Sequence, residues 1–309
     1  MIHTRYPDKI ACAYLYPITR YGYPPDIRQT ISHISEMAAL GFSSLELEGI
    51  GEENIHYLYK HSSDIADALA NAGCKVPVLC VVLPQLGAVD AAERTRSLEY
   101  FEMGCEVARS LGAQAVLDNG PLLPLGYPRQ TPIRRHYGEE QLAALSLPPT
   151  FSWYKYWHAL VATFQEACGI AQRYQLTYDL HPCEGSLITD TDSFTLFATA
   201  VDRPNLLFNL DTANQFYFRD NLPLSVHRLV GKTRYIHLSD NTGSRVEHLV
   251  PGDGRIQWDA FFSALRDINF QGNFALDIGG AETPISDLQA AYGRAARWLQ
   301  EKLETYSLN

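Results

Sequence analysis

Residues 206–214 read LLFNLDTAN, a short apolar run that ends in polar residues. The same pattern stands at 176–182 (LTYDLHP), at 233–241 (TRYIHLSDN) and at 273–280 (NFALDIGG). Apolar runs of this length, bounded by polar residues or glycine, are typical of buried β-strands. Between consecutive runs lie stretches that are long enough for an amphipathic helix. This half of the chain therefore predicts alternating strands and helices.

The alternation continues back to the N-terminal region. The eight strand candidates are 10–18, 43–49, 75–84, 113–120, 176–182, 206–214, 233–241 and 273–280. The helix candidates are 26–40, 55–72, 90–111, 156–174, 190–201, 223–230, 258–268 and 284–305, several of which begin at Asp or Ser and end at Gly. Eight such units favour a closed parallel barrel over an open doubly wound sheet. We expect an α/β protein, a (β/α)₈ TIM barrel that forms a single domain over 1–309.

One strand–helix unit is longer than the others. Residues 121–156, PLLPLGYPRQTPIRRHYGEEQLAALSLPPTFSWYKY, lie between the fourth strand and the fourth helix. Because all βα loops of a barrel emerge at the face that carries the active site, this insertion is predicted to form a lid, a substrate wall or a subunit contact. The alternative is a surface embellishment. Arg134, Arg135 and His136 within it either meet an anionic group or form a solvated turn.

Composition limits the class of protein. Of the 309 residues, 46% are hydrophobic and 19% are charged, as in a well-packed globular chain. The net charge of −10 disfavours nucleic acids and anionic membrane surfaces as partners. The N-terminal region has no apolar stretch, and no window is long and apolar enough to span a membrane. The six scattered cysteines suit a reducing compartment, so we expect a cytoplasmic protein.

Each of the last four strand candidates carries a group that can bind a hard metal ion. These groups are Asp179, Asp211, His237 and Asp277. Any one aspartate is equally common at a turn or a helix N-cap. Four such groups on successive strands would converge at the barrel mouth, where clustered carboxylates repel one another unless a cation is present. The pattern predicts a divalent metal site that leaves positions open for substrate oxygens and suits Mn²⁺, Mg²⁺, Co²⁺ or Zn²⁺.

Several longer motifs carry a resemblance to a known family. They are GFSSLELEG at 41–49, DLHPCEG at 179–185, NLDTAN at 209–214, IHLSDN at 236–241 and PGDGRIQW at 251–258. Over nearly its whole length the sequence resembles the xylose isomerase-like family of sugar isomerases and epimerases. The resemblance implies that the metal ligands are Asp179, Asp211, His237 and Asp277, with Mn²⁺ expected first. The family usually has glutamate at the first and last of these positions. Aspartate is one methylene shorter, so the metal sits deeper, the backbone shifts, or a contact runs through water.

Further positions that match the family imply substrate contacts. Glu184 and Arg245 stand where relatives keep a glutamate and an arginine that face the sugar. Asn214 stands where relatives often have histidine; it can hydrogen-bond a hydroxyl group but cannot act as an acid or base near neutral pH. His181 or His248 would supply a replacement, although each histidine is equally well explained as a supporting or surface residue.

The second strand ends in Glu46 and Glu48. One of this pair is expected to face the barrel mouth, and we take Glu48 as a substrate contact.

This constellation suggests enolisation of a sugar. A metal that holds neighbouring carbonyl and hydroxyl oxygens stabilises the enediolate that forms when a proton leaves the carbon between them. Asp179 and Asp277 would remove and return that proton. Return to the opposite face is epimerisation, and return to the neighbouring carbon is isomerisation. We expect an isomerase or epimerase. The alternative is a lyase that acts on a keto sugar or an oxidised glycoside by subsequent elimination, such as a dehydratase or the catalytic subunit of a C-glycoside deglycosidase.

Two other classes were weighed. A nuclease of the same superfamily would need a basic groove for phosphates, and the acidic balance argues against it. A non-catalytic barrel that serves as a subunit would explain the shortened ligands. The expected partner is a small carbohydrate. The resemblance also implies a homo-oligomer, and a second subunit that covers the barrel mouth stays open.

Overall fold

The strands close into a parallel barrel. The structure, a computed structural model, describes residues 5–127, 132–281 and 283–308. Its strands are β1 (Ile10–Cys12), β2 (Ser44–Leu45), β3 (Leu47–Ile50), β4 (Val78–Val82), β5 (Ala115–Asn119), β6 (Thr177–His181), β7 (Leu206–Phe208), β8 (Leu210–Asp211), β9 (Tyr235–Leu238) and β10 (Asn273–Leu276). They pair in the orders β2-β1-β10-β9-β8 and β3-β4-β5-β6-β7. Only Glu46 separates β2 from β3, and only Asn209 separates β7 from β8. The two sheets therefore join into eight barrel strands, and the predicted fold is confirmed.

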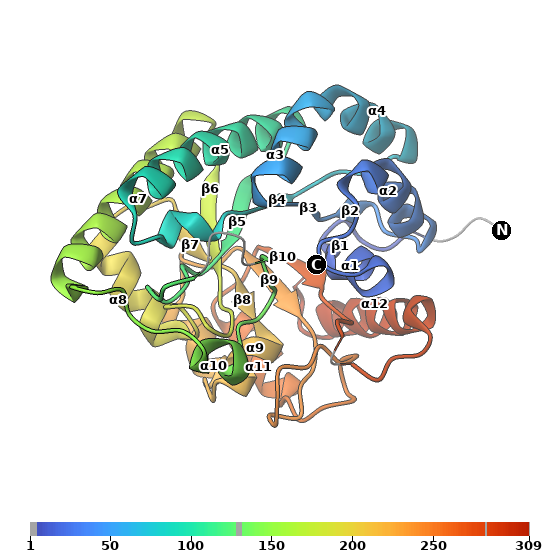
Figure 1. Ribbon diagram of the computed structural model, residues 1–309. Helices are drawn as coiled ribbons and strands as arrows, with labels where there is room; N and C mark the ends of the chain where they lie inside the picture. Colours follow the sequence, from blue (N-terminus) through green and yellow to red (C-terminus); the bar gives the residue numbers. More distant parts are fainter. Residues whose placement is uncertain (1–4, 128–131, 282, 309) are drawn as a thin grey trace.

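Helices form a ring around these strands (Figure 1). They are α1 (Leu15–Tyr21), α2 (Thr30–Ala39), α3 (Gly51–Lys60), α4 (Ser62–Ala72), α5 (Ala91–Ser110), α6 (Glu139–Ala143), α7 (Trp153–Arg173), α8 (Thr191–Val201), α9 (Thr212–Tyr217), α10 (Leu222–Arg228), α11 (Trp258–Asp267) and α12 (Leu288–Thr305), with short 3₁₀ turns η1 (Ile27–Gln29) and η2 (Pro84–Gly87). In the described part of the chain, no helix combines the length and the apolar character that crossing a membrane requires.

Two predicted strands are shorter than expected because helices begin inside them. The predicted strand 10–18 ends at Cys12, and α1 follows from Leu15. The predicted strand 206–214 ends at Asp211, whose carboxylate accepts a hydrogen bond from the backbone N–H of Asn214 and so caps α9. Polar capping chemistry therefore decides where this strand stops.

Residues 120–152 connect β5 to α7 and contain α6. Helix α7 begins at Trp153, three residues before the predicted start of the fourth helix. Residues 128–131 of the predicted segment 121–156 lie outside the described residues.

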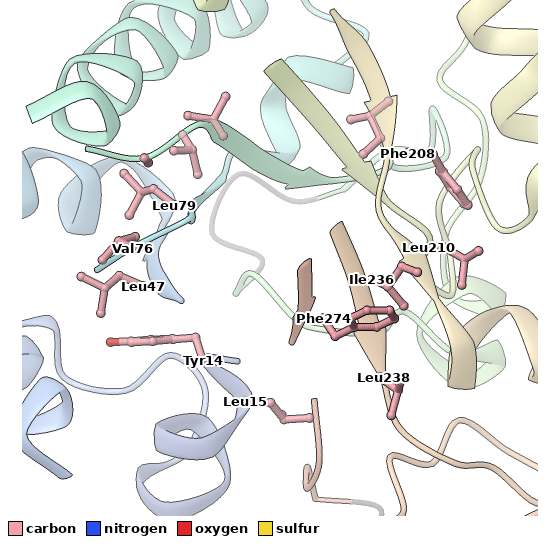
Figure 2. Packing of buried hydrophobic residues seen from close by; sticks show 14 of the residues in the cluster. Tyr14, Leu15, Leu47, Val76, Leu79, Phe208, Leu210, Ile236, Leu238 and Phe274 are labelled. Carbon is pink, nitrogen blue, oxygen red and sulfur yellow. The ribbon is translucent and has the colours of Figure 1, made fainter. Parts of the chain in front are cut away.

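Both faces of the strands are buried. Leu47, Leu79, Phe208, Ile236 and Phe274 pack between the strands and the surrounding helices (Figure 2). The barrel interior holds a second cluster of mainly smaller side chains: Ala11, Ala13, Ile50, Val78, Cys80, Val82, Ala115, Leu117, Tyr235 and Ala275. Alternation along each strand produces the two clusters, since successive side chains point to opposite faces. Partly buried Tyr23 and Ile133 also pack against the interior cluster, so two segments outside the strands reach the barrel mouth.

Candidate metal centre

Potential metal ligands converge at the carboxyl ends of the later strands. His181 ends β6, Asp211 ends β8, His237 lies in β9, and Asp277 follows β10 directly. The strand register places His237 beside Asp211. Ligand atoms of His181, Asp211 and His237 lie within 4.8 Å of one another. A second set with the same spread combines Asp211 and Asp277 with His248, so Asp211 belongs to both sets.

The contacts inside this cluster are short and buried. His181 Nε2 lies 3.1 Å from Asp211 Oδ2, and His237 Nδ1 lies 3.9 Å from the same oxygen. His248 Nδ1 lies 3.1 Å from Asp277 Oδ2. Burial raises the pKa of Asp211, but the hydrogen bond from His181 together with the charges of His181 and His248 leaves the pKa below its usual value. The cluster therefore holds carboxylates in their charged, metal-binding form.

Glu46 orients the imidazole of His237. The distance from His237 Nε2 to Glu46 Oε2 is 2.8 Å, and both side chains are buried. Burial lowers the pKa of His237, but Glu46, with smaller contributions from Asp277 and Asp211, raises the pKa to about 9. With Nε2–H donating to Glu46, Nδ1 faces Asp211 as the free ring nitrogen. A carboxylate that fixes a histidine in this way supports metal binding by the other nitrogen.

The unpaired atoms of the cluster fit a cation. His181 Nδ1 and His237 Nδ1 are buried and make no hydrogen bond. Buried polar atoms without partners are rare in proteins and call for an explanation. Imidazole nitrogens with carboxylate oxygens form a donor set that suits a divalent transition metal such as Mn²⁺, Co²⁺ or Zn²⁺. The residues of this site therefore fit the divalent metal expected from the sequence.

The structure does not bring Asp179 to the cluster. Asp179 lies two residues before His181 on β6, and its Oδ1 accepts a hydrogen bond of 2.8 Å from Thr177. Residues i and i+2 share a face of a strand, but they differ by roughly 6.6 Å along it. Asp179 thus points to the barrel interior below the mouth, where burial raises its pKa to about 7. His181 occupies the level of the cluster.

The other predicted substrate contacts divide into two groups. Asn214 is buried beside His181: its Nδ2 lies 3.5 Å from His181 Nε2 and donates to the carbonyl of Pro182 at 3.1 Å, while Oδ1 makes no hydrogen bond. Arg245, in contrast, is 61% exposed and binds Glu247. Glu184 lies beside Tyr217, whose pKa it raises in addition to the effect of burial. Neither Arg245 nor Glu184 lines the cavity next to the cluster.

A small cavity of about 40 Å³ opens onto the cluster. It is lined by both Glu46 and Glu48, although only one of the pair was expected to face the mouth. Because these residues are two apart, they share a face of the strand, and the break between β2 and β3 does not change this. Burial and the neighbouring Glu46 raise the pKa of Glu48 to about 8. Sequence alternation alone was sufficient to predict that both would line the cavity.

Tyr23, Arg135 and His136 also line this cavity. Arg135 lies 3.8 Å from Asp277 Oδ2 and 3.4 Å from His248 Nε2. His248 and Arg135 together hold the pKa of Asp277 well below its usual value, against the effect of burial. From the sequence, Arg135 and His136 were expected to meet an anionic group or to form a solvated turn. No local pattern places them over the cluster, because they belong to a connection of irregular structure.

A sequence model described as the xylose isomerase-like TIM barrel matches residues 34–302. The chain belongs to this family. This xylose isomerase-like barrel is also similar to several solved structures. D-allulose 3-epimerase from Methylomonas sp. is 17% identical with a TM-score of 0.73, over 97% of this chain and 100% of that chain. The 3-keto-D-glucoside 4-epimerase from E. coli is 16% identical with a TM-score of 0.71, over 96% and 100%.

A third similar structure is the IOLI protein, which was determined with a bound zinc atom. It is 18% identical with a TM-score of 0.67, over 96% of this chain and 98% of that chain. At these identities, the three structures establish the barrel fold of this family member and no more.

Proposed function

We propose that the chain is a divalent-metal-dependent sugar epimerase or isomerase that acts on a keto sugar. The observation that carries the proposal is the convergence of His181, Asp211, His237 and Asp277 beside a cavity at the carboxyl ends of the barrel strands. It is supported by the family, by two similar structures that are sugar epimerases, and by one that holds zinc.

In this proposal His181 takes the role first given to Asp179. The metal would be held by His181, His237, Asp211 and Asp277, with His248 beside Asp277. When bound, a divalent cation supplies Lewis-acid polarisation of neighbouring carbonyl and hydroxyl oxygens, so that the carbon between them loses a proton more easily. Mn²⁺ stays the first expectation for its identity.

The chain's own residues supply the proton transfers. Glu48 and Asp277 line the same cavity from different barrel strands. Burial keeps Glu48 protonated near neutral pH, with a pKa of about 8, whereas Asp277 stays a carboxylate. Two carboxyl groups with divergent pKa values in one cavity form an acid–base pair. Asp277 accepts the proton from the sugar carbon, and Glu48 donates one from the other side. Asn214 offers its unpaired Oδ1 to a sugar hydroxyl.

The lyase alternative uses the same first step and would act on an oxidised glycoside. The similar structures described above that carry a named activity are epimerases, so the epimerase is favoured.

Metal analysis and proton exchange test the proposal. After reconstitution with Mn²⁺, we expect about one divalent ion per chain and deuterium at one carbon of a converted keto sugar when the reaction is run in D₂O and followed by NMR. His237→Ala should abolish turnover, because it removes a ligand atom and the partner of Glu46. Absence of bound metal, or substantial activity of this variant with added Mn²⁺, contradicts the proposal.

A further inference from the structure

A second and much larger cavity lies beside the barrel mouth. Its volume is about 740 Å³, and it opens above the carboxyl ends of β3, β4 and β5. Its wall includes Gln85, Val89, Leu122, Leu123 and Tyr127. None of these residues lines the small cavity at the metal ligands. The proposed reaction gives this space no role.

One short segment separates the two cavities. Residues 133–137, here called the strap, belong to the connection between β5 and α7. Ile133 lines the large cavity, whereas Arg135 and His136 line the small one. Tyr137 lines the large cavity and also a crevice of about 10 Å³ to which Arg134 contributes. Successive residues of the strap thus face the two cavities and the crevice.

The crevice shares wall residues with both cavities. It shares Pro84, Leu122 and Tyr137 with the large cavity. It shares Asn119 with the small cavity. The crevice therefore lies next to both cavities, and single residues of its wall separate it from each of them.

The volumes require the strap to move when a sugar binds. A cavity of about 40 Å³ holds roughly three water molecules, which is too little for a sugar ring. The polar contacts between the strap and the rest of the barrel include the hydrogen bond from Tyr137 N–H to the carbonyl of Glu184 at 3.1 Å and the approach of Arg135 to His248 at 3.4 Å and to Asp277 at 3.8 Å. Once Arg135 and His136 withdraw, the small cavity opens towards the large one. The combined space lies in the range of sites for drug-sized ligands.

We propose that the large cavity binds an aryl substituent of a glycoside whose keto sugar lies at the metal ligands. This rests on the proposed function and narrows its substrate class from free sugars to glycosides. The wall favours an aromatic ring, because Val89, Leu123 and Tyr127 offer apolar surface. Gln85 and the ion pair between Arg96 and Glu52 offer polar atoms to ring hydroxyl groups. One similar structure is a 3-keto-D-glucoside 4-epimerase, and a glucoside carries a substituent at its anomeric carbon.

The test compares substrates that differ only in the substituent. The Mn²⁺-loaded protein is assayed with the 3-keto derivatives of phenyl and methyl β-D-glucoside and with a free ketohexose. We expect kcat/KM for the phenyl glycoside to exceed that for the methyl glycoside by about tenfold, because the ring buries apolar surface in the cavity. Equal kcat/KM for the two glycosides overturns the proposal.

Cavity-filling variants locate the effect. Val89 is 39% exposed, so Val89→Trp adds bulk to the cavity without disturbing the core. It should reduce the preference for phenyl over methyl about tenfold. The matched control Val230→Trp changes a 58% exposed valine that lies between α10 and β9, at the other end of the barrel, and should keep the preference. Leu123→Trp, with Leu196→Trp on α8 as its control, repeats the comparison if Val89→Trp unfolds.

Binding separates this proposal from the proposed function. If no substrate turns over, the proposed function fails, and phenyl β-D-glucoside itself is titrated into the metal-free protein by calorimetry. Binding that Val89→Trp weakens about tenfold and Val230→Trp leaves intact supports the aryl site by itself. Binding that Val89→Trp does not change, or no binding at all, overturns the aryl site.

Discussion

Replacing Glu46 with glutamine removes the charge that controls His237. The two side chains are 2.8 Å apart and both are buried. In the metal-free protein Glu46, with smaller contributions from Asp277 and Asp211, raises the pKa of His237 to about 9, so the imidazole is protonated at pH 7. A protonated imidazole has no lone pair for a metal, so binding releases a proton. Metal affinity of the wild type should therefore rise with pH and level off near pH 9.

The size of this effect follows from the pKa. Affinity should rise about tenfold per pH unit below the pKa of His237, which gives roughly thirtyfold between pH 7.0 and pH 8.5. In Glu46→Gln, burial still lowers the pKa of His237 and only Asp277 and Asp211 raise it, so the affinity should depend much less on pH over this range. Loss of the carboxylate that orients the ligand costs about 10–100-fold. The variant should thus bind far more weakly than the wild type at pH 8.5, and the gap should narrow at pH 7.0.

Competition with a chromogenic chelator measures Mn²⁺ affinity across these pH values, under exclusion of oxygen. Glu102→Gln is the matched control, because Glu102 pairs with Arg173 on the outer helices and is 43% exposed. It should leave the pH profile of the wild type intact. A wild-type affinity that does not change between pH 7.0 and pH 8.5 would refute the assignment of His237 Nδ1 as a ligand under the control of Glu46.

Three further outcomes follow from the geometry. His181→Ala should weaken metal binding about tenfold or more, whereas Asp179→Asn should leave it within about threefold, as read by metal content after dialysis. Folding raises the pKa of Asp179 from 3.8 to about 7, so its buried charge opposes folding more strongly as pH rises through this window. The free energy of unfolding of Asp179→Asn, measured in urea, should exceed that of the wild type by at most about 4 kcal/mol at pH 8 and by little at pH 4. Gly185 has φ of 82°, and an added Cβ would lie 2.5 Å from Tyr137 Cβ. Gly185→Ala should therefore lower the stability by at least about 1–2 kcal/mol in thermal unfolding. Gly169→Ala is the control and should not lower it, because no atom lies within 4 Å of the added Cβ.

Much of the architecture followed from the sequence because strand and helix periods are local properties. Eight apolar runs predicted eight barrel strands, and the structure has strands in each of them. Alternation along the strands likewise predicted on which strand face Asp211 and His237 lie. Their convergence was predicted because parallel strands end at the same edge of the barrel. Capping was the local signal that the strand prediction overlooked, since Asp211 ends its strand by starting α9.

How deep a side chain lies along the barrel axis could not be predicted from the neighbouring sequence. Asp179 and His181 share a strand face, and only the register of β6 against its neighbours shows that His181, and not Asp179, reaches the cluster with Asp211 and His237. The contact between Glu46 and His237 joins residues 191 positions apart, and Arg135 reaches Asp277 from an irregular connection. The sequence by itself determined the barrel and the placement of Asp211, His237 and Asp277 on its later strands or directly after them. Only the tertiary structure decided which side chains meet there, because depth and long-range contact depend on how the strands are staggered around the closed barrel.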